Sequence, residues 1–294
     1  MKSLLNYIGK KSNLDIQDYI DKAGIEIDTY CEPFSGGFSA GLTLLEKGFT
    51  GKVVLNDLDT EVYNFWICLR DDWEKLYNTI CNILKVLDEL HIKDEQMQII
   101  YKYKKSLDSF DRASAEYIYR KMLTITGIRN SLKKFNDTEI DFFLQSELLN
   151  RRNVEIFNLD YKEILKKFDG EKTFFLIDPP YYVNNVANYY RCDSEFFYHK
   201  ELRDELINLN AKILITYNDD TYIYDLYKEH NFYLECIYRC FGGIYIELYF
   251  NNFKDFSEDD NRKQTLLNRL DSQETIAVAK TQEDILDISE LFGE

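Results

Sequence analysis

An alternation of β-rich runs and helical patterns constrains the fold of this chain most strongly. The β-rich runs lie near residues 28–33, 52–57, 154–158, 173–178, 211–217, 232–239 and 244–250. The helical patterns lie near residues 13–23, 38–48, 58–69, 72–90, 160–168, 199–209 and 220–230. Strands that alternate with helices form right-handed crossovers, so the sequence predicts an α/β fold with a mostly parallel sheet. Only "CFGG" separates the last two β-rich runs, which predicts a terminal antiparallel hairpin.

The alternation is interrupted between residues 72 and 150, where helical periodicity and many charges replace the β-rich runs. We interpret residues 72–150 as an inserted helical subdomain, which leaves residues 1–71 and 151–253 to form the main domain. The C-terminal tail, residues 254–294, carries 11 acidic and 5 basic side chains and shows no strand pattern. Its last residues fit a short amphipathic helix. Two interpretations stay open: a helix that binds a partner protein, and a frayed terminus.

The composition indicates a globular protein that keeps its thiols reduced. The hydrophobic share is 45%, and no apolar run approaches the roughly 20 residues that cross a membrane. The N-terminal stretch "MKSLLNYIGKKSNLD" lacks the apolar core of a signal peptide, so we expect a cytoplasmic protein. The six cysteines form no CxxC pair, and the three histidines show no metal-ligand spacing. We therefore expect neither a disulfide framework nor a metal site.

Charge is distributed unevenly along the chain. The formal net charge is −16, which taken alone disfavours a nucleic-acid partner, because affinity for phosphate comes from Lys and Arg. Residues 99–134 differ: they hold nine basic and three acidic side chains, with tyrosines interleaved. Two interpretations of this segment stay open, a solvated helix face and a surface that follows a phosphate backbone.

A glycine-rich stretch, "CEPFSGGFSAG" at residues 31–41, follows the first predicted strand. Gly36, Gly37 and Gly41 permit close approach of the backbone to a ligand at the carboxyl end of that strand. The stretch is neither GxGxxG nor a Walker loop, and it has no Lys-Ser/Thr pair for a nucleotide phosphate. It suits a ligand with a carboxylate and an adenosyl group. A plain strand-loop-helix turn is the alternative.

Asp57 ends the next strand in "VVLNDLD", about 20 residues after the glycine-rich stretch. In a doubly wound fold, an acid at this place binds a ribose diol. Asp57 is also suited to cap the helix expected at 58–69, although Asp59 serves that role equally well. We favour ribose binding over capping for Asp57.

The stretch "FFLIDPPYYVNN", residues 174–185, holds two of the three prolines in the chain. Proline cannot donate a backbone hydrogen bond, so Pro179 and Pro180 end the buried strand before them. The Asp178 carboxylate and the Pro179 carbonyl can both accept hydrogen bonds from one exocyclic amine, and Tyr181 offers a flat ring for stacking. Two acceptors favour a tetrahedral, nucleophilic nitrogen, which methylation of such an amine requires. A base in a duplex must be flipped out to reach them.

Together these motifs resemble the Dam-like alpha group of N6-adenine DNA methyltransferases, over about residues 4–253. The order of the family is kept: cofactor loop, inserted recognition region, then the Asp-Pro-Pro-Tyr motif. The resemblance implies a Rossmann-like S-adenosylmethionine-dependent methyltransferase fold that methylates a flipped adenine in double-stranded DNA without a metal. Two alternatives stay open: a non-catalytic module that keeps the fold, and an RNA methyltransferase. Restriction-modification, phage self-marking and gene regulation would all use the same residues.

The resemblance also implies roles for individual residues. The catalytic residues are Asp178, Pro179 and Tyr181. The cofactor-binding residues are Tyr7, Lys11, Glu32, Phe34, Ser35, Gly36, Gly37, Asp57, Asp160, Tyr161 and Asp178. The candidates for contact with DNA come from the basic segment and the recognition stretch, and are Arg120, Lys121, Arg129, Asn130, Lys133 and Lys134. Weaker candidates for the base pocket are Tyr182, Tyr189 and Tyr190.

The stretch "TGIRNSLKKFND", residues 126–137, corresponds to the recognition hairpin of the family. It keeps Gly127, Arg129 and Asn130 but lacks the glycine and proline turn of the family. We therefore expect a shortened hairpin in this chain.

Overall fold

The computed structural model describes residues 2–7, 11, 14–90, 92–124, 127–128, 137–182, 198–240, 244–255 and 276–278. The chain divides into two compact units. The first comprises Met1–Gln17 and Thr29–Ile164, and the second comprises Asp18–Asp28 and Leu165–Glu294. This grouping puts the predicted helical insertion in the same unit as the glycine-rich stretch. The three-part division expected from the sequence stays a prediction.

The first unit contains three parallel strands, β1 (Thr29–Glu32), β2 (Lys52–Asn56) and β5 (Val154–Phe157). The central strand β2 pairs with β1 on one side and with β5 on the other. Val53, Val54 and Leu55 of β2 are fully buried, as expected for a strand that is covered on both faces. Helix α2 (Ser39–Glu46) connects β1 to β2.

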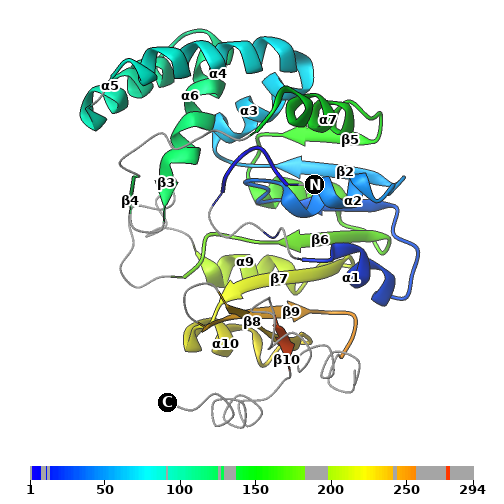
Figure 1. Cartoon of the computed structure of the whole chain (residues 1–294). Coiled ribbons are helices and arrows are strands. Elements are labelled where there is room, and N and C mark those ends of the chain that lie inside the picture. The colour runs from blue at the N-terminus through cyan, green and yellow to red at the C-terminus, as the bar shows by residue number, and fades with distance from the viewer. Residues whose placement is uncertain are drawn as a thin grey trace. The chain divides into compact units, whose positions relative to one another are not determined.

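The predicted helical region is present in the first unit. Its helices are α3 (Thr60–Asp71), α4 (Trp73–Asp88), α5 (Lys93–Lys104), α6 (Ser109–Met122) and α7 (Glu139–Leu149). Helices α4, α5 and α6 lie side by side (Figure 1), and α6 also packs against α3. Phe65 of α3 and Tyr117 of α6 stack with ring centroids 6.0 Å apart. A two-residue antiparallel ladder, β3 (Leu123–Thr124) with β4 (Gly127–Ile128), follows α6.

The second unit combines a parallel pair of strands with antiparallel neighbours. Strand β6 (Thr173–Ile177) pairs in parallel with β7 (Lys212–Asn218). Strand β9 (Ile244–Asn251) pairs antiparallel with β7 and with β8 (Tyr233–Cys240). The predicted terminal hairpin is therefore confirmed. The other helices within the described ranges are α1 (Ile16–Lys22), α8 (Tyr161–Phe168), α9 (His199–Leu206) and α10 (Thr221–Tyr227).

The expectation that no strand follows Phe253 was wrong. Strand β10 (Ile276–Val278) pairs antiparallel with β8. Its sequence, Ile-Ala-Val, contains two β-branched residues but is too short to show a period-2 pattern. A partner protein for the tail stays a prediction, and the terminal amphipathic helix lies outside the described residues.

The fold is a mixed, Rossmann-like α/β fold with an antiparallel end. None of the described helices combines the length and the apolar character that crossing a membrane requires. Across the described ranges, no three His, Cys, Asp or Glu side chains form a group that could hold a metal ion. Cys31, Cys68 and Cys81 are free thiols.

Candidate active site

The carboxyl ends of β1, β2 and β5 lie at one edge of the first unit, because the three strands are parallel. Three predicted elements follow these strands: the glycine-rich stretch, Asp57, and the Asp160–Tyr161 pair. We call this group the cofactor edge. Since the elements come from sequence positions more than 100 residues apart, the fold itself must bring them together.

The glycine-rich stretch packs tightly against the N-terminal segment. Gly36 has a φ of 46°, and a Cβ atom there would lie 2.9 Å from Cδ1 of Tyr7. A Cβ atom on Gly37 would lie 2.9 Å from the carbonyl oxygen of Leu5. Both positions therefore require glycine, the first also because of its left-handed backbone. The structure thus places Tyr7 directly over the predicted cofactor loop.

Glu32 organises the first turn of α2. Its Oε1 atom accepts hydrogen bonds from the hydroxyl of Tyr30 and from the backbone amide of Gly41, both at 2.7 Å. The nearby hydroxyls of Ser35 and Ser39 are buried and have no hydrogen-bond partner in the part of the chain that the structure describes. Buried polar groups are normally satisfied, so two such hydroxyls at one helix start suit a polar ligand. The residues present therefore fit a cofactor with a polar end.

Asp57 is held by the backbone on both of its oxygens. Its Oδ2 atom accepts from the Gly36 amide at 2.8 Å, and its Oδ1 atom accepts from the Asp59 amide at 2.9 Å. Burial raises the pKa of this carboxyl from 3.8 to about 6. The N-terminal cap of α3 is Asp59, which accepts from the Glu61 amide. Capping of α3 by Asp57 is therefore excluded, and ribose binding stays a prediction.

Two further residues of this edge escaped the sequence reasoning. Asn56 donates to the carbonyls of Pro33 and Leu159 at 2.9 and 3.0 Å and accepts from the Leu159 amide. It thereby ties the segments after β1 and β5 together. The indole of Trp66 donates to the Gly36 carbonyl at 3.1 Å. Two features of the sequence could have indicated these residues: Asn56 is a polar residue at the end of an apolar strand, and Trp66 is one of only two tryptophans in the chain.

An aromatic pair completes the cofactor edge. The rings of Phe34 and Tyr161 have centroids 5.2 Å apart, at an angle of 34°. Phe34 remains partly exposed within an otherwise buried loop, so it can contact a planar ligand. Asp160 accepts from the Lys162 amide at 2.8 Å at the start of α8. Lys11, the remaining predicted cofactor residue, is buried at 4% exposure.

The cations of the insertion are largely engaged by carboxylates. Arg120 is 5% exposed, and its guanidinium bonds Glu116 at 2.6 Å and Asp59 at 3.0 Å. It also lies over the ring of Tyr7, 4.4 Å from the centroid. This burial is at odds with the predicted contact of Arg120 with DNA, because a phosphate cannot reach a side chain enclosed by two carboxylates. Arg120 instead links α6 to the cofactor edge.

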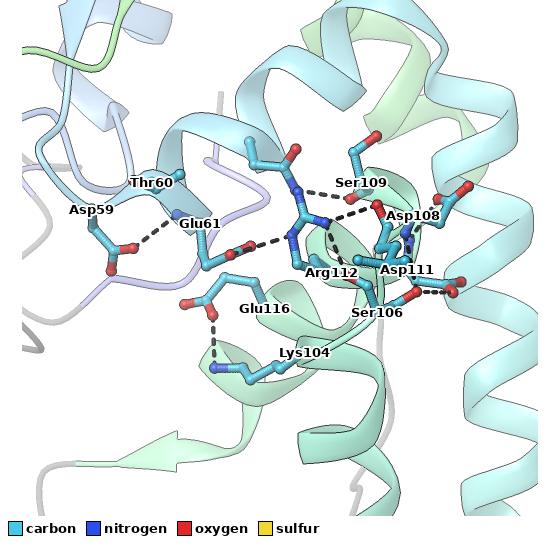
Figure 2. A network of polar contacts seen from close by, with 12 residues as sticks. Asp59, Thr60, Glu61, Lys104, Ser106, Asp108, Ser109, Asp111, Arg112 and Glu116 are labelled. Carbon is cyan, nitrogen blue, oxygen red and sulfur yellow. Dashed lines mark hydrogen bonds and ion pairs between the residues drawn. The ribbon is translucent and has the colours of Figure 1, made fainter.

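The neighbouring cations follow the same pattern. Lys104 pairs with Glu116 and Arg112 pairs with Glu61 (Figure 2). The nitrogen–oxygen distances are 2.7 and 3.4 Å. Lys121 is paired with Asp137. Its contact with DNA stays a prediction. The other predicted DNA-binding residues lie outside the described residues; they are Arg129, Asn130, Lys133 and Lys134. Two candidates for the base pocket, Tyr189 and Tyr190, also lie outside them.

The Asp-Pro-Pro-Tyr motif lies in the second unit, directly after the fully buried strand β6. We call residues 178–182 the catalytic segment. Asp178 accepts a hydrogen bond from the Thr216 hydroxyl at 2.7 Å. The hydroxyl of Tyr181 donates to Glu247 at 3.0 Å. Burial and the nearby Asp178 carboxylate raise the pKa of Tyr181 well above its usual value, so its phenol remains a neutral donor.

A second aromatic group lies beside this segment. Tyr182 contacts His199 edge-on at 5.5 Å and Tyr222 at 4.7 Å between ring centroids. Nδ1 of His199 lies 2.8 Å from the hydroxyl of Tyr217. Burial lowers the pKa of His199 to about 4, so this ring is neutral and packs as part of the core. The sequence reasoning missed Thr216 and Glu247, because nothing in their local pattern indicates their partners.

Comparisons with known proteins relate the chain to one family. A family model described as "D12 class N6 adenine-specific DNA methyltransferase" matches residues 7–239. Among solved structures, "Putative methyltransferase yhhF from Escherichia coli" matches with 11% sequence identity and a TM-score of 0.34, covering 84% of this chain and 90% of that chain. No match was found among curated proteins. Because the family model spans most of the sequence, the chain belongs to the D12 class N6 adenine-specific DNA methyltransferase family.

Proposed function

We propose that this chain transfers a methyl group from S-adenosylmethionine to the N6 amine of an adenine that is flipped out of double-stranded DNA. The catalytic segment carries the proposal: an acid and a tyrosine with fixed side chains follow a buried parallel strand. Ligands of Rossmann-like sheets bind at such strand ends. Membership of an adenine methyltransferase family supports the same reaction.

The proposed roles of the catalytic residues follow from what the amine requires. The Asp178 carboxylate and the backbone carbonyl of Pro179 each accept a hydrogen bond from one N–H group of the adenine amine. The amine lone pair is then withdrawn from the ring and directed at the methyl carbon. Formation of the N–CH3 bond would break the S–CH3 bond, leave S-adenosylhomocysteine as the product and release one amine proton to solvent. These acceptors act most strongly on the positive charge that develops in the transition state, which is the condition for catalysis. Tyr181 stacks on the flipped base.

S-adenosylmethionine, when bound, supplies a methyl group that its sulfonium already activates. We propose that the cofactor edge holds it, with Asp57 on the ribose and Phe34 and Tyr161 against the adenine ring. The unsatisfied hydroxyls of Ser35 and Ser39 suit its polar amino-acid end. The remaining residues proposed to line this edge are Tyr7, Lys11, Glu32, Gly36, Gly37 and Asp160. The contact of Asp178 with the cofactor, which the family resemblance implies, stays a prediction.

The test is methyl transfer from labelled S-adenosylmethionine to unmethylated duplex DNA, with the product nucleoside identified. We expect label in N6-methyladenine from the wild type and none from Asp178→Ala, which should still bind the cofactor. Asp204→Ala is the matched control, because Asp204 is an exposed residue of α9 and should leave turnover unchanged.

Three other results would contradict the proposal. Label in RNA but not in DNA would favour an RNA methyltransferase. Cofactor binding without transfer to any nucleic acid would favour a non-catalytic module. The pairing of Arg120 and Lys121 in α6 with carboxylates makes this alternative worth testing. Full activity of Asp178→Ala would remove the acid from the reaction.

A further inference from the structure

We propose that Thr216, Asn218 and Glu247 are positioning residues, which together hold the catalytic segment in the shape that methyl transfer needs. The inference rests on the proposed function, because it concerns the same segment. It adds three residues from β7 and β9, none of which belongs to the Asp-Pro-Pro-Tyr motif.

Two residues of the catalytic segment cannot donate a backbone hydrogen bond. Pro179 and Pro180 follow Asp178 directly, and neither can donate a hydrogen bond to a neighbouring strand. The pairing of β6 with β7 ends accordingly, at Ile177 opposite Ile215. Beyond that point, side chains of the adjoining strands supply hydrogen bonds to the segment.

Thr216 supplies the first of these bonds. It directly follows Ile215 in β7 and is fully buried. Its hydroxyl donates to Oδ1 of Asp178 at 2.7 Å. A hydrogen bond to a carboxylate at this length is among the stronger ones in proteins, and a β-branched side chain has few alternative rotamers. Thr216 therefore fixes the direction in which the Asp178 carboxylate points.

Asn218 and Glu247 hold the other end of the segment. The amide of Asn218 donates to the backbone carbonyl of Tyr182 at 3.0 Å. Glu247 lies opposite Asn218 in β9 and accepts from the Tyr181 hydroxyl at 3.0 Å. Since Thr216 and Asn218 are alternate residues of one strand, all three side chains lie on the same face. One face of the paired strands β7 and β9 thus holds both the acid and the tyrosine ring.

The decisive variant is Thr216→Val, which replaces the hydroxyl by a methyl group of the same shape. The loss of a hydrogen bond to a charged group should lower kcat by about 10-fold to 100-fold. KM for cofactor and for DNA should change by less than about threefold, because the substitution leaves intact the contacts that bind the ground state and the transition state equally. Thr216→Ser, which keeps the hydroxyl, should restore kcat to near the wild-type value.

Thr173→Val is the matched control. Thr173 is a buried residue at the start of β6, and its hydroxyl donates at 2.7 Å to the carbonyl of Phe168. The Thr173→Val variant loses a hydrogen bond of the same length in the same unit. Thr173 lies at the start of β6, whereas Asp178 follows its end. A comparable loss of stability with an unchanged kcat is expected.

A second readout needs no turnover. Hydrogen exchange at the backbone amides of Tyr181 and Tyr182 should be faster in Thr216→Val than in the wild type, and unchanged in Thr173→Val. An active wild type, together with a Thr216→Val variant of equal kcat and equal exchange, would overturn the inference. If the wild type methylates nothing, the proposed function fails, and the exchange rates alone decide whether Thr216 positions the segment.

Discussion

At the end of β2, side chains bind the backbone: Asp57 accepts from the amide of Gly36, and Asn56 donates to the carbonyl of Pro33. At the end of β6, the side chains of Asp178 and Tyr181 are themselves held by side chains: Thr216 donates to Asp178, and Glu247 accepts from Tyr181. The cofactor edge therefore presents a shaped loop, whereas the catalytic segment presents oriented functional groups.

This difference predicts how each region responds to substitution. A shaped loop is sensitive to added atoms and to the groups that support its backbone. Oriented side chains are sensitive to the loss of single hydrogen bonds, as in Thr216→Val. At the cofactor edge, we expect the largest effect from the loss of Arg120, through which α6 supports this edge.

Replacement of Arg120 by Met should destabilise the protein most. The substitution leaves Glu116 and Asp59 without the guanidinium that bonds both, and breaking a buried ion pair costs about 3–5 kcal/mol. Arg112→Met is the matched control on the same helix, because Arg112 is more exposed and lies 3.4 Å from Glu61; we expect a loss of about 1 kcal/mol. Denaturant unfolding measures both, and equal losses would show that α6 does not support the edge in this way.

Gly36→Ala should weaken cofactor binding by about tenfold or more, because an added Cβ atom would displace the Tyr7 ring. Gly48→Ala is the matched control: Gly48 also has a positive φ, of 91°, but nothing lies within 4 Å of its Cβ position. Both variants carry backbone strain of about 1 kcal/mol. Calorimetric titration with S-adenosylmethionine should separate them, and equal affinities would refute the shaped-loop interpretation.

The pH dependence of cofactor binding should report on Asp57, whose folded pKa of about 6 lies above its ordinary 3.8. Between these values the folded protein binds more protons than the unfolded chain. Stability without cofactor should therefore rise as the pH falls from 6 towards 4. Cofactor affinity should fall over the same range, by up to about tenfold per pH unit, if the ionised carboxylate accepts the ribose hydroxyls.

Asp57→Asn is the control for this pH dependence, since it removes the titrating group while keeping an acceptor oxygen. Calorimetric titrations at several pH values should give a flat profile for the variant. A wild-type affinity that stays constant below pH 6 would remove Asp57 from the binding site.

Local patterns in the sequence were sufficient for most elements of the fold. The run at 173–178 was expected as a strand, and β6 spans Thr173–Ile177. The hairpin of β8 and β9 followed from the short "CFGG" connection. In both cases the determining residues are neighbours in the chain, so periodicity and turn chemistry carry the information.

The supporting contacts could not be predicted, because their partners are distant in the sequence. Arg120 and Asp59 are 61 residues apart, and Thr216 and Asp178 are 38 apart. A basic residue in a basic segment looks like a phosphate contact until the fold supplies its carboxylates. Strand β10 was missed for a related reason, since three residues become a strand only through pairing with β8.

The hydrogen bond between Tyr181 and Glu247 has an entropic consequence. A free tyrosine side chain samples several rotamers, and ordering a side chain at a binding site costs about 0.5–1.5 kcal/mol. In this protein the ring of Tyr181 is ordered when the chain folds. A planar group that stacks on this ring therefore binds a side chain that has already lost its rotational freedom. The affinity of that group is not reduced by the cost of ordering the ring.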